Sequence, residues 1–296
     1  MCISDGGTSE NSLTSQEAFA ILGNEYRAEI IRTLGDEQGS EGPRPILSFS
    51  ELYSKSDVDI ATSQFNYHLQ RLVGPFIENI EEGYRLRHGA VTLYRTILAG
   101  TYIRETHIED FNVGVDCYYC DAPIEARYAD RRFTILCSGC GQTYSDTTAP
   151  PSVSEGDREA LLNRIDQYIR HRILAFSKGV CSICANELRT RFLPGDDLAA
   201  PRSDQLDVFV HRSCDYCGAQ QYMSVGLSLL YNSSLIAFFQ ERDLDVTTTP
   251  IWELEFAMTD RFVDIRSTDP WEVALCIEQG GEELELVVDD NLTVLN

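Results

Sequence analysis

Cysteines with the spacing of metal ligands recur along this 296-residue chain. Eight of its ten cysteines form the four Cys-x-x-Cys pairs Cys117/Cys120, Cys137/Cys140, Cys181/Cys184 and Cys214/Cys217, which leave Cys2 and Cys276 outside. A two-residue gap lets both thiolates of a pair bind one ion at about 2.3 Å, and two pairs complete the tetrahedron that Zn²⁺ prefers. The spacing therefore predicts two structural zinc sites, each made of two consecutive pairs.

The two predicted sites differ in the length of the chain between their pairs. The first two pairs are separated by residues 121–136, which is within the usual range for a zinc ribbon. The last two are separated by the longer segment 185–213. Gly218 follows Cys217 as Gly141 follows Cys140, and glycine leaves the backbone free to turn back toward a metal.

Other uses of these cysteines are open but fit less well. A disulfide framework needs an oxidising compartment, and residues 1–7 have neither the basic nor the apolar part of a secretory signal. A thioredoxin-like redox site has one such pair, not four in regular couples. Catalytic zinc needs an open coordination position, whereas four thiolates fill all of them. His211 is an alternative ligand of the second site, or else a solvated residue of a strand over 206–211.

The charge of the chain narrows its class and its environment. The formal net charge is −23, and 22 of the 24 basic residues are arginine, because Lys55 and Lys178 are the only lysines. An acidic, lysine-poor surface is typical of proteins from concentrated salt, where self-repulsion is screened. An ordinary acidic protein is the alternative, but it leaves the scarcity of lysine unexplained. No apolar run approaches eighteen residues, so no segment is expected to span a membrane. From the charge pattern we expect a halophilic protein of the cytoplasm.

The N-terminal region begins with signals for a helical domain. Residues 1–13 lack any hydrophobic period and are expected to be disordered. Thr14 with Glu17, and Ser48 with Glu51, have the spacing of capping boxes, which predicts helix starts at both places. Apolar residues at helical spacing predict one or two helices up to about residue 34, and residues 39–45 form a turn-rich loop.

A further helix is predicted over residues 62–73, and its two faces differ. Phe65, Leu69 and Leu72 share one face, which we expect to pack. The opposite face carries polar side chains able to contact nucleic acid, and the segment contains no acid. The candidate DNA contacts on this helix are Ser63, Gln64, Tyr67, His68 and Arg71.

A hairpin and one more helix complete the N-terminal region. Residues 76–80 and 84–87 are predicted strands around a turn, and Arg85 and Arg87 are candidate contacts to the DNA backbone. A helix follows over residues 90–103. These elements follow the order of a winged helix-turn-helix, namely helix, short helix, polar-faced helix and hairpin. We place this domain at residues 14–108.

The same region resembles a known family. Residues 21–31, ILGNEYRAEII, resemble the "LG…R..I" opening of ArsR-type regulators, and residues 64–69, QFNYHL, followed by GYRL at 83–86, resemble haloarchaeal members of that group. The resemblance covers residues 15–100 and extends less specifically to the cysteine-rich region. It implies a sequence-specific transcriptional regulator that binds double-stranded DNA. Residues 50–60 lack the Cys-x-Cys pair of the metal-sensing members, so metal sensing at that position is not expected.

Beyond this domain the sequence predicts four further segments of a multidomain α+β protein. They are zinc ribbon 1 over 109–148, a linker and helix over 149–178, zinc ribbon 2 over 179–223 and an acidic α/β module over 224–296. In the first ribbon, strands are predicted over 123–128 and 131–136, with Arg127, Arg131 and Arg132 nearby as weaker phosphate contacts. The last module should not touch DNA, because fourteen acids and two arginines follow residue 242.

Two classes of function remain open. The first is a DNA-binding regulator, which pairs into a homodimer through residues 15–23 and 90–103 if it follows the usual arrangement. The second is a transcription-associated adaptor that uses the winged helix and the ribbons for protein contacts. An enzyme is not expected, since the five histidines are scattered and the sequence has neither a phosphate-binding glycine loop nor a nucleophile beside an evident base. The target promoter and any small-molecule effector cannot be read from these residues.

Overall fold

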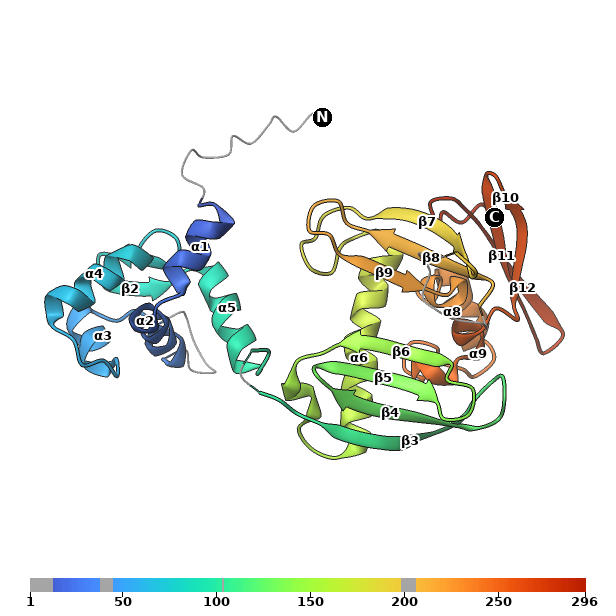
Figure 1. Ribbon diagram of the computed structural model, residues 1–296. Coiled ribbons are helices and arrows are strands. Elements are labelled where there is room, and N and C mark those ends of the chain that lie inside the picture. The colour runs from blue at the N-terminus through green and yellow to red at the C-terminus, as the bar shows by residue number, and fades with distance from the viewer. Residues whose placement is uncertain (1–12, 38–44, 103, 198–205) are drawn as a thin grey trace. The chain divides into compact units, whose positions relative to one another are not determined.

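The computed structural model describes residues 13–37, 45–102, 104–197 and 206–296. Within these residues the protein combines helices with four small antiparallel sheets, as expected for the α+β class. The chain divides into two compact units, Met1–Ile103 and Arg104–Asn296 (Figure 1). None of the described helices has the length and apolar composition needed to cross a bilayer. The tail predicted over 1–13 and the loop predicted over 39–45 fall almost wholly outside the described residues.

The first unit is mainly helical. Its elements are α1 (Ser15–Leu22), α2 (Glu25–Asp36), α3 (Phe49–Lys55), α4 (Thr62–Leu72), β1 (Ile77–Ile80), β2 (Gly83–Leu86) and α5 (His88–Leu98). Both predicted capping boxes are present. The Thr14 hydroxyl accepts the Glu17 amide at 3.2 Å while the Glu17 carboxylate accepts the Thr14 amide at 2.8 Å, and Ser48 and Glu51 repeat this exchange. Asn24 caps a second helix start, so the predicted N-terminal helical run is two helices.

The core of the first unit holds α4 against α3. The Phe65 ring packs edge-on against Phe49 and Tyr53, with ring centroids 5.8 and 5.0 Å apart. Leu69 and Leu72 are fully buried on the same side of α4. Burial of these side chains fixes which face of the helix is covered and leaves the opposite face in solvent.

The hairpin is tied to the segment before α3. β1 and β2 pair antiparallel from Ile77 opposite Leu86 to Ile80 opposite Gly83. Leu47 exchanges two backbone hydrogen bonds with Tyr84, at 3.0 and 2.8 Å. Gly83 has a φ of +141°, and a Cβ there would overlap the carbonyl oxygen of Leu47, so this close approach requires glycine.

The second unit contains three sheets. Its strands are β3 (Ile108–Asp116), β4 (Pro123–Ala129), β5 (Arg132–Cys137), β6 (Thr143–Thr148), β7 (Arg189–Pro194), β8 (Val208–Ser213), β9 (Gln220–Met223), β10 (Val263–Thr268), β11 (Trp271–Gln279) and β12 (Glu282–Asp289). Its helices are η1 (Pro151–Ser154), α6 (Arg158–Ser177), α7 (Val225–Ser228), α8 (Ser233–Gln240), η2 (Ile251–Glu253) and α9 (Glu255–Met258). The sheets have the strand orders β3-β4-β5-β6, β7-β8-β9 and β10-β11-β12.

Two of these sheets are built on the same plan. In each, one Cys-x-x-Cys pair precedes an antiparallel two-stranded segment, a second pair follows it, and one more strand comes three residues after the last cysteine. β4, β5 and β6 therefore correspond to β7, β8 and β9. The last strand of each set, β6 or β9, lies at an edge of its sheet.

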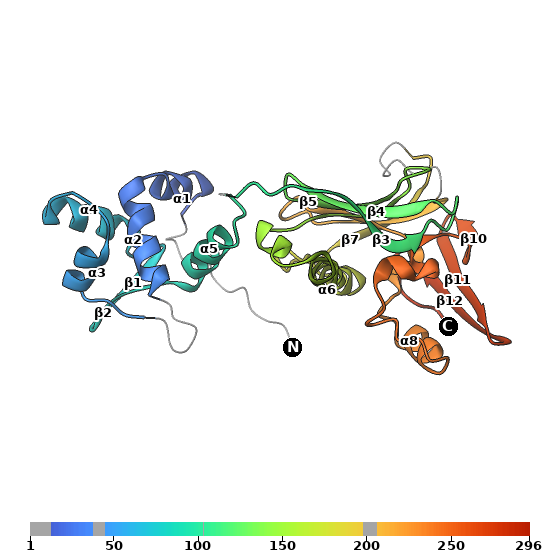
Figure 2. The same ribbon diagram turned by 90° about the horizontal axis from the view of Figure 1, so that it is seen from below.

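The long helix α6 packs on these sheets. Figure 2 shows β3, β4, β5 and β7 on one side of α6. Its buried apolar residues recur every three or four positions and form one stripe, namely Leu161, Ile165, Ile169, Ile173 and Phe176. These residues belong to one core that includes all three sheets of the unit. The predicted segments 109–148, 149–178, 179–223 and 224–296 thus share a single core and are not separate packing units.

The segment before α6 differs from the prediction. Residues 149–152 were expected to be a linker, but Ala149, Pro151 and Val153 are buried and the Tyr128 hydroxyl donates to the Ala149 carbonyl at 2.8 Å. The two prolines prevent a regular helix or a paired strand, yet their fixed φ suits the short 3₁₀ turn that packs here. The interpretation as a linker is therefore wrong.

The C-terminal part contains α8 and the sheet β10-β11-β12, and Trp252 is buried in the core. In the described part of the chain residues 292–295 form no strand, and Val294 makes only an isolated bridge to Val288. Leu292 has a φ of +64°, so the chain turns at that position.

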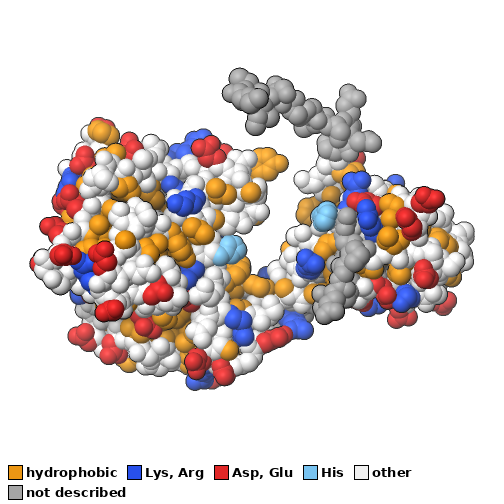
Figure 3. All heavy atoms as spheres, turned by 180° about the vertical axis from the view of Figure 1, so that it is seen from behind, with side chains coloured by type: hydrophobic (Ala, Val, Ile, Leu, Met, Phe, Trp, Pro, Cys, Tyr) orange, Lys and Arg blue, Asp and Glu red, His pale blue; other side chains and the backbone are white. Residues whose placement is uncertain are grey.

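Acidic side chains are spread over both units on the face seen in Figure 3.

A buried ion pair joins α6 to the C-terminal part. Arg170 donates to Asp166 at 2.6 Å, and both side chains are almost completely buried. Arg170 also donates to the carbonyls of Val246 and Thr249, and the second Asp166 oxygen accepts the Ile251 amide at 3.0 Å. Together the two side chains satisfy the backbone of the segment that leads into η2.

Breaking this pair should destabilise the second unit strongly. Arg170→Met leaves the Asp166 carboxylate buried without its counter-charge, which costs about 3 kcal/mol or more. The same change at Arg189, whose ion pair with Asp215 is exposed, should cost less than about 1 kcal/mol. Urea unfolding followed by tryptophan fluorescence measures the difference, because Trp252 and Trp271 both lie in this unit. Equal losses in the two variants would contradict the structural role of the buried pair.

Candidate metal centres and nucleic-acid interface

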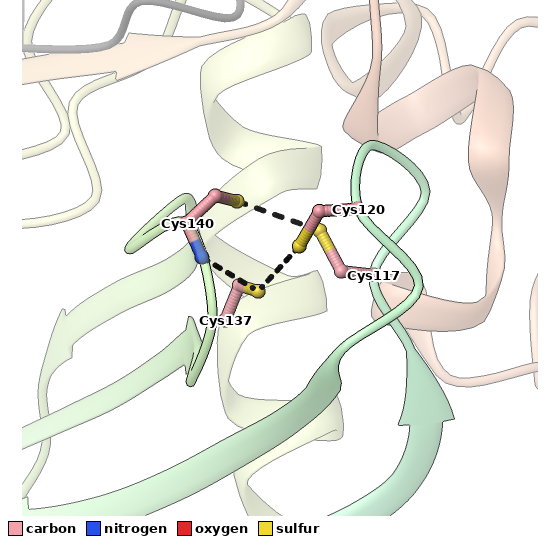
Figure 4. Close-up of side chains that lie close together, drawn as sticks. All are labelled: Cys117, Cys120, Cys137 and Cys140. Carbon is pink, nitrogen blue, oxygen red and sulfur yellow. Dashed lines mark hydrogen bonds between the residues drawn. The ribbon is translucent and has the colours of Figure 1, made fainter.

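The first two cysteine pairs meet at one end of the sheet β3-β4-β5-β6. Cys117 and Cys120 lie between β3 and β4, Cys137 is the last residue of β5, and Cys140 lies between β5 and β6. Figure 4 shows the four side chains converging, with the Cys117 and Cys140 sulfurs 3.7 Å apart and those of Cys120 and Cys137 3.4 Å apart. All four sulfurs lie within 4.8 Å of one another.

The last two pairs form a second cluster with the same cross-pairing. The Cys181 and Cys217 sulfurs are 3.6 Å apart, and those of Cys184 and Cys214 are 3.5 Å apart. Sulfurs bound at about 2.3 Å to one tetrahedral ion would lie about 3.8 Å from each other. Both clusters come close to this separation, so the eight predicted ligands are grouped as the sequence indicated and could hold two metal ions.

Each of the four pairs is shaped by the same backbone turn. The amide of the first cysteine donates to the carbonyl five residues later, and the amide four residues later donates back to that cysteine. The residue after each second cysteine has a positive φ, namely Asp121, Gly141, Ala185 and Gly218. Glycine meets this requirement at two of the turns without steric cost. At Gly139 a Cβ would lie 2.7 Å from the Ala122 side chain, so that position is also restricted to glycine.

Hydrogen bonds stabilise a thiolate in the first cluster. The Tyr144 hydroxyl donates to the Cys117 sulfur at 3.2 Å and accepts the Tyr118 amide at 2.9 Å. Burial raises the pKa of Cys117, but the hydrogen bonds from Tyr144 and from the Tyr119 amide outweigh it and lower that pKa to about 6. Burial and the neighbouring thiols raise the pKa of Cys140 to about 12. Four adjacent thiols resist full ionisation, and a bound cation would remove that resistance.

The turns of the second cluster expose two large side chains. Ile183 and Tyr216, which precede the second cysteine of each pair, are 73% and 79% exposed. At the first cluster the corresponding Tyr119 is half-buried, and the hydroxyl of its neighbour Tyr118 donates to the Trp252 carbonyl. His211 is not among the clustered ligands. It was expected to be solvated, but its ring is partly buried and stacks on Tyr222 with centroids 4.5 Å apart, so that expectation is wrong.

The exposed face of α4 carries most of the predicted DNA contacts. Ser63, Gln64, Tyr67 and Arg71 are all exposed on it. No side chain caps the N-terminus of α4, and its first turn has no acid. The free backbone amides and the positive end of the helix dipole are therefore available to an anion such as a phosphate.

His68 is a correction to the predicted contact set. It is only 8% exposed, and its ring lies 5.1 Å from that of Tyr26 and 5.3 Å from that of Tyr67. Its Nδ1 atom is buried without a hydrogen-bond partner among the described residues. Burial and the nearby charge of Arg27 lower the pKa of His68. The buried ring lies on the packing side of α4, unlike the other predicted contacts on this helix.

The arginines of the two hairpins differ in availability. Arg85 donates to Glu78 at 2.7 Å, so its charge is already neutralised, whereas Arg87 is exposed at the start of α5. In the hairpin of β4 and β5, Arg132 forms an ion pair with Asp146, whereas Arg127 is exposed. Arg87 is thus the stronger candidate of the two predicted hairpin contacts.

Two exposed residues of α4 were missed by the sequence analysis. Asn66 and Gln70 both lie in solvent, and the Gln70 amide donates to Asn66 at 3.4 Å. They extend the polar face beyond Ser63, on the side away from Arg71. Helical spacing contained the signal, because Asn66 lies four residues before Gln70 and three after Ser63, so all three share one side of the helix.

The comparisons with known proteins agree with the division into two units. The molecule is an α+β protein with two four-cysteine clusters in its larger unit. The chain belongs to the family of the domain of unknown function DUF7351, whose model matches residues 114–294. Residues 15–97 match the model of a second domain of unknown function, DUF7347. No curated protein and no solved structure matches the chain.

The two clusters predict a metal content of two ions per chain. Cys137→Ser removes a ligand from the first cluster and should reduce the content to about one, whereas Cys276→Ser, outside both clusters, should leave it unchanged. Inductively coupled plasma mass spectrometry on the purified full chain measures both. A metal-free wild-type protein, prepared without chelators, would contradict this assignment.

The environment of His68 predicts a pH effect on the first unit. Because its pKa in the folded state lies below the ordinary value of 6.5, the unfolded chain takes up this proton first as the pH falls. The free energy of unfolding of the first unit should therefore decrease below about pH 6.5. Calorimetry from pH 7 to 5 should detect a smaller loss in His68→Phe, and a loss identical to that of the wild type would exclude the histidine as its source.

Proposed function

We propose that this protein is a DNA-binding transcriptional regulator whose first unit is a winged helix-turn-helix. The order α3, turn, α4, hairpin supports this assignment, with α4 as the helix that enters the major groove. The observation that carries the proposal is the exposed face of α4. It presents hydroxyl, amide, phenol and guanidinium groups and no carboxylate, in a chain of net charge −23.

The chemistry of this face suits contacts with base edges. Gln64 has the amide donor and acceptor that pair with adenine, and Arg71 has the fork of donors that pairs with guanine. The uncapped N-terminus of α4 and the exposed Arg87 are suited to phosphate contacts, which set the register of the helix on DNA. The interface residues of this proposal are Ser63, Gln64, Asn66, Tyr67, Gln70, Arg71 and Arg87.

The two clusters are proposed to bind Zn²⁺ as structural ions. Tetrahedral sites with four thiolates suit zinc or iron, and zinc brings no redox chemistry that would need a partner. Because four cysteines complete the coordination, no position remains for a water or a substrate. The zinc ions would close the ends of the two small sheets in the second unit, and no catalytic role is proposed for them.

A homodimer is part of the proposal. Helices α1 and α5 were the expected pairing elements, and each carries an exposed large apolar side chain, Phe19 at 76% and Leu98 at 54% exposure. Exposed apolar groups of this size favour burial against a partner. A two-fold dimer would place two copies of α4 on the half-sites of a palindrome.

DNA binding is tested on duplexes selected from a random pool by the full chain. Arg71→Ala should weaken binding to the selected sequence by roughly tenfold or more and relax the base preference at one position, because a bidentate base contact contributes about 1–3 kcal/mol. Arg191→Ala removes an exposed arginine from β7 in the other unit and should have no such effect. Fluorescence anisotropy at fixed salt measures both, and unchanged affinity in Arg71→Ala would reject the assigned face.

A transcription-associated adaptor is the second candidate. The exposed Ile183 and Tyr216 at the tips of the second cluster favour it, because they form an apolar surface on an otherwise polar module. The same selection separates the two functions. A recovered sequence motif supports the regulator, whereas a pool without enrichment supports the adaptor.

A further inference from the structure

A groove lies between the two sheets of the second unit that carry cysteine clusters, β3-β4-β5-β6 and β7-β8-β9. Each of these sheets with its four cysteines is called a cysteine module below. Its volume is about 490 Å³, and residues of β6 and β9 line it together with residues of α6. These strands are the corresponding edge strands of the repeated modules, and no described strand pairs with the outer side of either one. Sites for small molecules commonly have volumes of about 300–1,000 Å³. The groove is therefore large enough for a compact ligand.

The base of the groove is apolar. It is formed by side chains from α6, β8, α7 and α9, and most of them are buried. These residues are Ile169, Ile173, Phe209, Leu227 and Met258. A ligand that covered them would remove apolar surface from water, which favours binding.

The walls of the groove are polar, and most of their side chains are uncharged. β6 contributes the hydroxyls of Thr143, Ser145 and Thr147, and β9 contributes the side chains of Gln221 and Tyr222. Edge strands also direct alternate backbone N–H and C=O groups away from their own sheet, here toward the groove. The walls thus offer several hydrogen bonds around an apolar base.

Arg172 is the one cation among the described residues that line the groove. It donates to the Thr147 hydroxyl at 2.6 Å, and no carboxylate of the described residues lies within ion-pair distance of it. Asp146 is the one lining carboxylate, and its charge is taken by Arg132. A partly buried guanidinium without a counter-charge loses hydration, and an anion from a ligand would compensate that loss.

We propose that this groove binds a small organic anion, a carboxylic acid with a compact apolar body. The carboxylate pairs with Arg172 and accepts hydrogen bonds from the wall hydroxyls, while the apolar body covers the base between α6 and β8. The site is independent of the proposed DNA-binding function, because every residue in it belongs to the second unit.

Isothermal titration calorimetry of the full chain tests the site with benzoate and hexanoate, at one fixed KCl concentration. Both acids should bind the wild type saturably, and the neutral analogues benzamide and hexanamide should bind at least about tenfold more weakly, since they lack the charge that pairs with arginine. Inorganic phosphate is the second comparison. Phosphate binding as tight as that of the acids would overturn the requirement for an apolar body.

Matched variants locate the site. Arg172→Gln should weaken binding of both acids by about tenfold or more, whereas Arg127→Gln, an exposed arginine of β4 outside the groove, should bind like the wild type. Thr143→Trp fills the groove from an exposed wall position and should also prevent binding. Thermal melts identify any variant that fails to fold, and two independent variants keep the test decisive. Saturable binding unchanged in Arg172→Gln, or no binding of either acid to the wild type, overturns the proposal.

Discussion

The second unit has to hold four cysteine sulfurs together at one end of each of two sheets, β3-β4-β5-β6 and β7-β8-β9. Sheets of three or four short strands bury little apolar surface and need additional constraints to persist. In both clusters the backbone turn that begins at the first cysteine of each pair forms hydrogen bonds between its own amides and carbonyls. The sulfurs of opposite pairs lie 3.4–3.7 Å apart. Four thiols so close together resist ionisation, as the raised pKa of Cys140 illustrates, so a bound dication would stabilise this arrangement.

Helix α6 turns the two clustered modules into one body. Its apolar stripe packs on both sheets, while Arg170 and Asp166 satisfy the backbone of the segment before η2. At the C-terminal end of α6, the buried Arg212 of β8 donates to the Phe176 carbonyl. Because α6 contacts both modules from one side, their edge strands β6 and β9 are left on either side of a groove and are not joined into one sheet.

The features that sequence predicted well are those set by local spacing. The capping boxes at Thr14 and Ser48 and the cysteine turns depend on residues within a few positions of one another, and all of them are present. Long-range packing was not predictable in the same way. His68 lies at the border of the two faces of α4, and its packing against Tyr26 of α2 is a tertiary contact that helical spacing does not reveal. Asp166 and Arg170 have the spacing of an ordinary exposed helical pair, so their burial required knowledge of the tertiary contacts.

If an acidic protein binds DNA, the part of its surface that attracts the DNA has to be small and free of carboxylates. Between residues 14 and 100 there are twelve acids and eight basic residues, so this segment as a whole repels a phosphate backbone at long range. Salt screens that repulsion beyond about 8 Å at physiological ionic strength and over shorter distances in concentrated salt. Salt also weakens the gain from releasing counterions, which leaves direct hydrogen bonds as the main source of affinity. In the proposed complex the exposed side of α4 meets this condition, because Gln64 and Arg71 would bring donors to the bases and the helix has no carboxylate.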